Sequence, residues 1–89
     1  MKVKNGFILR KVSDTYVVVA TGEAAKEFNG MITLNETGAF LWEKLAEGCK
    51  DISELTAKLL DEYDVPEDVA TKDVAAFIAR IRDAQLIEE

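Results

Sequence analysis

The chain has 89 residues, of which 48% are hydrophobic, and its formal net charge at pH 7 is −6. We expect one domain over residues 1–89, with a modest core but without a deep active-site cavity. The chain has no histidine, and its one cysteine is Cys49. This composition excludes an internal disulfide and a zinc-type cluster, so we expect no metal, no cofactor and a reducing, cytoplasmic setting. No apolar run approaches the ~20 residues of a membrane span, and no membrane contact is expected.

The first third of the sequence predicts a small antiparallel sheet. The β-branched and aromatic runs 7–12 and 15–20 flank Ser13-Asp14, which is typical of a β-hairpin with a two-residue turn. The polar segment 21–30 predicts a loop that holds at most one helical turn, and residues 30–34 predict a short third strand. Three consecutive strands form a meander that leaves two edges.

A helix is predicted directly after the third strand, because Asn35 is a good N-cap. The Asn35 side chain can accept a hydrogen bond from the N–H of Gly38, and a glycine at this position suits the close approach of another backbone. One arc of the helix faces inward and contains Gly38, Leu41, Trp42, Leu45 and Ala46. Phe40 lies on the opposite side, where either another element covers it or a partner does. Gly48 ends the helix.

Two further helices follow. Asp51 and Glu54 fit a capping box that opens a helix over residues 52–63, whose inward residues are Ile52, Leu55, Leu59 and Leu60. Pro66 opens a third helix over residues 66–84, whose core stripe contains Ala70, Val74, Phe77, Ile78 and Ile81. Leu86-Ile87 then packs back onto the core. The predicted class is α+β, like a winged helix-turn-helix with a three-stranded antiparallel sheet first and three helices after it.

The sequence carries no recognisable catalytic motif. Its paired acids lie at helix ends, where solvated carboxylates are ordinary, and Cys49 has no histidine to activate it. The glycines are too scattered to form a phosphate-binding loop. An acyl carrier is disfavoured because Ser53 is misplaced for its attachment site. We therefore expect a binding protein and not an enzyme.

Two binding functions remain. A winged helix suggests DNA or regulatory binding, but residues 27–89 hold six basic and fifteen acidic residues, which suits phosphates poorly. The alternative is an extended peptide that adds a strand to the free edge of the third strand. Apolar anchors would have to supplement the main-chain bonds, in a groove against a helix.

The runs "FNGMITLNETGAFLWEKLAEG", "DISELTAKLLDEYDV" and "KDVAAFIARIRDAQLIEE" resemble the PqqD family, named for pyrroloquinoline quinone biosynthesis. The similarity extends from about residue 7 to the end, although Gln85 stands where a glycine is expected. The resemblance implies a non-catalytic module that binds the leader region of a ribosomal precursor peptide. A radical S-adenosylmethionine enzyme would then modify the held peptide.

The resemblance also implies where the peptide lies, in a groove between the third strand and the third helix. Its strand side corresponds to Met31, Ile32, Thr33 and Leu34. On the helix, two flanks are candidates, and we prefer the one formed by Val69, Asp73, Ala76 and Arg80, which pairs an apolar floor with charges at its rim. The other flank consists of Thr71, Ala75, Ile78 and Arg82. The sequence leaves open whether the protein is a monomer or a homodimer.

Overall fold

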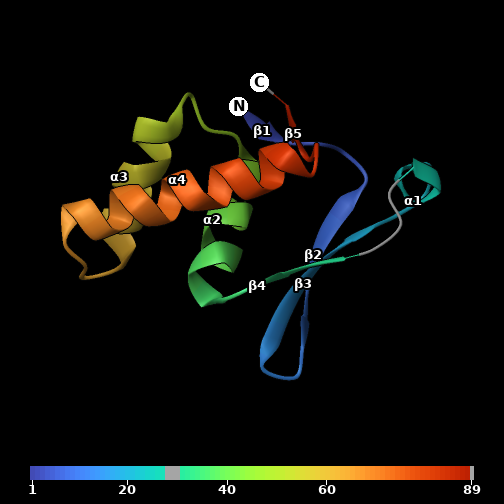
Figure 1. Cartoon of the computed structure of the whole chain (residues 1–89), viewed down its shortest axis with the longest axis horizontal. Helices are drawn as coiled ribbons and strands as arrows, with labels where there is room; N and C mark the ends of the chain where they lie inside the picture. The colour runs from blue at the N-terminus through green and yellow to red at the C-terminus, as the bar shows by residue number, and fades with distance from the viewer. Residues whose placement is uncertain (28–30, 89) are drawn as a thin grey trace.

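The computed structural model describes residues 1–27 and 31–88 and confirms the predicted α+β class (Figure 1). The elements in chain order are β1 (Lys2–Val3), β2 (Phe7–Val12), β3 (Thr15–Ala20), α1 (Ala24–Glu27), β4 (Met31–Leu34), α2 (Glu36–Glu47), α3 (Ile52–Glu62), α4 (Glu67–Asp83) and β5 (Ile87–Glu88). The predicted meander is the sheet β2-β3-β4, and α1 is the single turn expected in the loop. Gly30, predicted to start the third strand, lies outside the described residues. None of the described helices is long and apolar enough to cross a bilayer.

A second sheet, which the sequence pattern did not predict, pairs the two ends of the chain. Antiparallel pairing places Lys2 opposite Glu88 and Val3 opposite Ile87. The N–H of Lys4 also donates to the carbonyl of Leu86 at 2.8 Å. Val3 and Ile87 are both buried, so this short β1–β5 ladder closes one side of the core.

One hydrogen bond at the open end of the hairpin shows which of its residue pairs are hydrogen-bonded. The N–H of Thr21 donates to the carbonyl of Gly6 at 2.7 Å, one step beyond the Phe7–Ala20 pair. Bonded and non-bonded pairs alternate in an antiparallel ladder. On β3, residues 15, 17 and 19 therefore direct their N–H and C=O groups to β2. The residues between them direct theirs to β4.

This alternation fixes which backbone groups of β4 face the open edge. Val18 pairs with Ile32, and Tyr16 pairs with Leu34. Because the β3 member of each pair points toward β4, the N–H and C=O groups of Ile32 and Leu34 are used within the sheet. Those of Met31 and Thr33 point the other way, and within the described residues no strand lies beyond β4.

The start of α2 has the predicted cap. The side chain of Asn35 accepts a hydrogen bond from the N–H of Gly38 at 2.7 Å. A Cβ on Gly38 would lie 3.2 Å from both Asn35 Oδ1 and Leu34 Cβ. The prediction that another backbone approaches Gly38 is wrong, because the close neighbours are side-chain atoms of the two residues that precede the helix.

Local hydrogen bonds also define the other helices. At the start of α3, Asp51 accepts from the N–H of Glu54 at 2.9 Å, as in a capping box. The Glu54 carboxylate, however, accepts from the N–H of Lys50 at 3.1 Å and not from that of Asp51. At the end of α4, Leu86 donates to Ile81 and Gln85 to Arg82, which is the bonding of a Schellman motif. Gln85 adopts the left-handed φ of 62° that this motif requires.

The core confirms most of the predicted inward residues, including the whole stripe of α4. Two predictions are wrong: Ala46 is exposed, and Ile52 is 39% exposed. Both lie at the end of a helix that the neighbouring elements no longer cover, so the helical period overextends the buried face. Leu60 is only half-buried, although it packs against the core.

Candidate functional site

A pocket lies between the junction of β4 with α2 and the exposed side of α4. Its volume is about 220 Å³, and it is lined by Leu34, Asn35, Thr37, Gly38, Leu41, Asp73, Ala76, Phe77 and Arg80. The junction reaches this pocket because α2 begins immediately after β4, so its first turn lies at the end of the sheet. The absent side chain of Gly38 leaves part of this space open.

The pocket has an apolar floor and two charged residues. Leu34, Leu41 and Phe77 belong to the buried core and form the base, while Ala76 adds a small exposed methyl group. Asp73 and Arg80 are the charged members of the lining. They stand seven residues apart, almost two full turns of helix, so both side chains leave α4 on the same face.

Asp73 and Arg80 have no charged partner among the residues that the structure describes. The ion pairs among the described residues are Lys26–Glu23, Lys44–Glu47 and Lys58–Glu54. Across residues 1–27 and 31–88, the side chains of Asp73 and Arg80 form neither an ion pair nor a hydrogen bond. The rim of the pocket therefore offers a carboxylate and a guanidinium that no other described residue pairs with.

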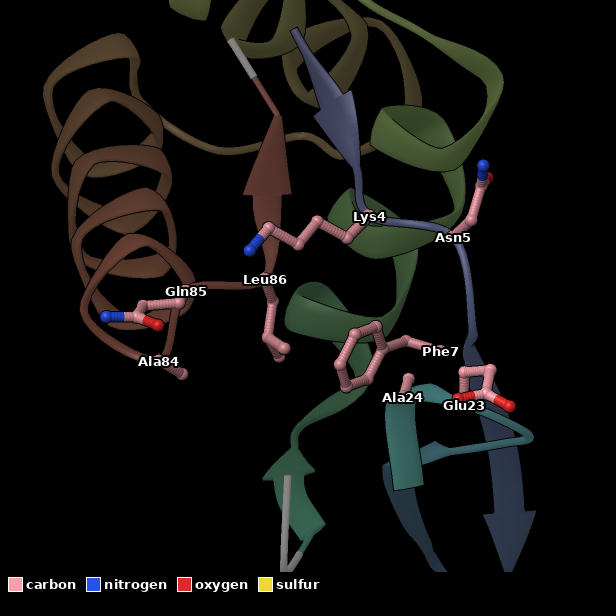
Figure 2. A pocket seen from close by; sticks show the side chains of 8 residues that line it. All are labelled: Lys4, Asn5, Phe7, Glu23, Ala24, Ala84, Gln85 and Leu86. Atoms are coloured by element: carbon pink, nitrogen blue, oxygen red, sulfur yellow. The ribbon is translucent and has the colours of Figure 1, made fainter. Parts of the chain in front are cut away.

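The strand and the helix beside this pocket run in opposite directions. In Figure 1, β4 runs from the grey trace toward α2, whereas α4 runs back toward the end of the chain. Figure 2 shows the same opposition from another side. The direction from Asp73 to Arg80 along α4 is therefore the same as the direction from Leu34 to Met31, which is backward along β4.

The structure places the sequence-predicted site residues in three groups. Leu34, Asp73, Ala76 and Arg80 meet at the pocket. Met31 and Thr33 contribute the outward-directed backbone of the edge, and Met31 is 62% exposed. Ile32 is buried beneath the sheet, and Val69, 41% exposed, lies outside the pocket lining.

On the alternative flank of α4, Ile78 is buried in the core and Arg82 lines a different hollow beside Met1 and Lys50. The two flanks therefore do not share one groove. Sequence reasoning assigned Asn35, Gly38 and Phe77 to capping and packing only, and it missed Thr37. One signal in the sequence could have indicated these residues. The helix follows the strand without a loop, which brings the first turn of α2 to the open edge of β4.

A second pocket, of about 290 Å³, begins where α4 ends. Figure 2 shows the ring of Phe7 directed toward Leu86, with Ala24 close to the ring. Lys4 and Glu23 add one charge of each sign to the lining. The first pocket is lined by α4 residues between Asp73 and Arg80, and this one by residues 84–86, which follow the helix, so the second pocket lies beyond the C-terminal end of α4.

Cys49 is buried beside the start of α3. Its thiol lies 3.6 Å from the carbonyl of Lys44, and Lys58 Nζ lies 3.9 Å from its sulfur. Burial raises the pKa of the thiol, although the positive charge of Lys58 opposes that rise. A protonated and inaccessible thiol is a poor nucleophile. No described group of three or more His, Cys, Asp or Glu residues is arranged to hold a metal ion.

Comparisons with known proteins give one family match and two solved structures of similar fold. The family model described as coenzyme PQQ synthesis protein D (PqqD) matches residues 14–87. The fold is similar to TbiB1 in complex with the TbiA(beta) leader peptide, with a TM-score of 0.73 and 22% identity over 99% of this chain and 95% of that one. It is also similar to lasso peptide synthetase B1 complexed with the leader peptide, with a TM-score of 0.71 and 17% identity over 99% and 96% of the two chains. A comparison with curated proteins gives no significant match.

Proposed function

The chain belongs to the PqqD family, and from this premise we propose that it captures the leader region of a ribosomally made precursor peptide. The domain holds the leader and presents the rest of the peptide to a modifying enzyme, a radical S-adenosylmethionine enzyme in our proposal. Two solved structures of similar fold are complexes with leader peptides, which supports this substrate class. Holding the peptide raises its effective concentration at the enzyme, so the domain itself needs no catalytic group.

The observation that carries the proposal is the open backbone of β4 beside an apolar pocket. Met31 and Thr33 direct their N–H and C=O groups away from the sheet. An extended peptide can pair with these groups and become a fourth strand. Its side chains that face α4 then lie over the pocket formed by Leu34, Ala76 and Phe77.

The energetics require both parts of this site. Four backbone bonds, two for Met31 and two for Thr33, contribute about 1 kcal/mol each. Micromolar binding requires about 8 kcal/mol, net of the costs of association. Apolar side chains that become buried, at about 1.5–3 kcal/mol each, supply the difference. We propose that the pocket beside Ala76 receives at least one of them.

Amide hydrogen exchange of the domain, with and without a leader peptide, tests the proposal. The ligand is the leader segment of the precursor peptide that is encoded nearest to the gene of this protein. In the saturated complex we expect slower exchange at Met31 and Thr33, because their amides become paired. The amides of Ile32 and Leu34 are an internal control, since they are already paired within the sheet. Binding without new protection at Met31 and Thr33 would contradict strand addition, and the absence of binding would contradict leader capture.

A further inference from the structure

We infer that the site selects a leader segment with an ordered charge pattern: a basic residue, then an apolar residue, then an acidic residue, each separated by one intervening position. This inference rests on the proposed function. It follows from the two charges of the pocket rim, Asp73 and Arg80, which have no partner among the described residues, and from the direction of the edge strand. It adds the chemical order of the ligand to the place where the ligand lies.

The order of the charges follows from the direction of the added strand. Antiparallel pairing is slightly more stable per residue than parallel pairing, so the peptide runs opposite to β4. Because β4 and α4 themselves run in opposite directions, the peptide runs along α4 in the same sense as the helix. Its N-terminal part therefore meets Asp73 first and its C-terminal part meets Arg80. A basic side chain complements Asp73, and an acidic one complements Arg80.

The spacing of the pattern follows from the rise of the two elements. Asp73 and Arg80 are seven helical residues apart, or about 10.5 Å along the axis. Alternate residues of an extended peptide face the same side, so facing positions are about 6.6 Å apart. Three successive facing positions span about 13 Å, and the flexible stems of Arg80 and of a peptide lysine can absorb the difference. The middle position then lies over Ala76 and the apolar floor.

The experiment is a selection of short random peptides displayed against the immobilised domain. The selection is repeated with the double variant that combines Asp73→Lys with Arg80→Glu, which exchanges the two charges. For the wild-type domain we expect enrichment of the order basic, apolar, acidic at alternate positions. For the double variant we expect the reverse order. Resynthesised peptides with the matching order should bind each domain about tenfold more tightly than their reversed counterparts, since two exposed ion pairs are replaced by two repulsions.

Three outcomes would overturn the inference, and the last of them would also contradict the proposed function. Enriched peptides without a charge order, or with an order unchanged in the double variant, would refute the charge pattern. If such peptides still protected the Met31 and Thr33 amides, the proposed function would stand. Enrichment of the order acidic, apolar, basic by the wild-type domain would refute the antiparallel orientation. No enrichment above the bare support, for either domain, would contradict peptide capture itself.

Discussion

The rings of Phe40 and Tyr63 meet edge to face, with their centroids 5.4 Å apart and their planes at 88°. Phe40 lies on α2, and Tyr63 is the residue that caps the C-terminal end of α3. Tyr63 therefore covers the aromatic residue that the helical pattern placed away from the core. This contact ties α2 to the connection between α3 and α4.

We expect Phe40→Ala to lower the free energy of unfolding by about 2 kcal/mol, below the 3–5 kcal/mol typical of a fully buried phenylalanine, because Phe40 is only half-buried. Urea denaturation measures the change. A double-mutant cycle with Tyr63→Ala should show a coupling of about 0.5–1.5 kcal/mol. Tyr63→Phe is the control, since it keeps the ring. Additive effects of the two alanine substitutions would contradict a direct ring contact.

Trp42→Ala should destabilise the domain by about 3–5 kcal/mol, because Trp42 is only 3% exposed within the core. Thermal unfolding followed by circular dichroism measures this loss. The neighbouring substitution Glu43→Ala changes an exposed residue of the same helix and should leave the melting temperature nearly unchanged. Equal effects of the two substitutions would show that the first long helix is oriented differently.

Gln85→Gly should stabilise the domain by about 0.5–1 kcal/mol, because Gln85 holds a left-handed φ of 62° that costs little for glycine. Ala84→Gly is the matched control. Ala84 has a right-handed conformation, with φ −81° and ψ −1°, and gains nothing from glycine there. The melting temperature should therefore rise for the first variant and fall for the second. A fall in both would contradict the assigned backbone geometry.

Proline substitutions at neighbouring positions of β4 separate peptide binding from folding. Thr33→Pro removes an N–H that points to the open edge, so the domain should remain folded but lose most of its affinity for the leader peptide. Ile32→Pro removes an N–H that is bonded to β3 and should destabilise the sheet itself. Calorimetric titration and thermal unfolding measure the two effects. A folded Thr33→Pro domain with full affinity would refute pairing at this residue.

Arg80→Glu should leave the domain folded and weaken leader binding by at least ~1 kcal/mol, the scale of one charge-assisted hydrogen bond. Lys72→Glu makes the same charge change at another exposed position of α4, outside the pocket, and should have a smaller effect. Fluorescence anisotropy of a labelled leader peptide measures both affinities. A larger loss for Arg82→Glu than for Arg80→Glu would assign the peptide to the other flank of the helix.

The sequence predicted those parts of the fold that short-range rules determine. The β-branched and aromatic runs on either side of Ser13-Asp14 predicted the hairpin, Asn35 predicted the start of α2, and the helical period predicted the buried stripe of α4. Ala46 and Ile52 were assigned inward because a helical pattern does not indicate where the covering elements end. The covering of Phe40 by Tyr63 depends on how two helices cross, which local patterns do not encode.

The candidate site was predictable only in its parts. The edge strand and the flank with Asp73, Ala76 and Arg80 were proposed from the family resemblance and the helical wheel. Their meeting at one pocket depends on the placement of α4 over the junction of β4 with α2. The direction of individual backbone amides also required the structure. Sequence alone does not show whether the N–H of Thr33 points to β3 or to the open edge.

The β1–β5 ladder closes a loop that contains nearly the whole chain, since Val3 and Ile87 are 84 positions apart. In an unfolded chain, closing a loop of this length costs about 4 kcal/mol of conformational entropy. The hydrogen bonds of a ladder of two residue pairs scarcely offset that cost. Once the helices and the main sheet are in place, the same two ends are already neighbours and the cost largely disappears. The ladder is therefore a contact of the highest contact order, and it should be among the last to form and the first to open.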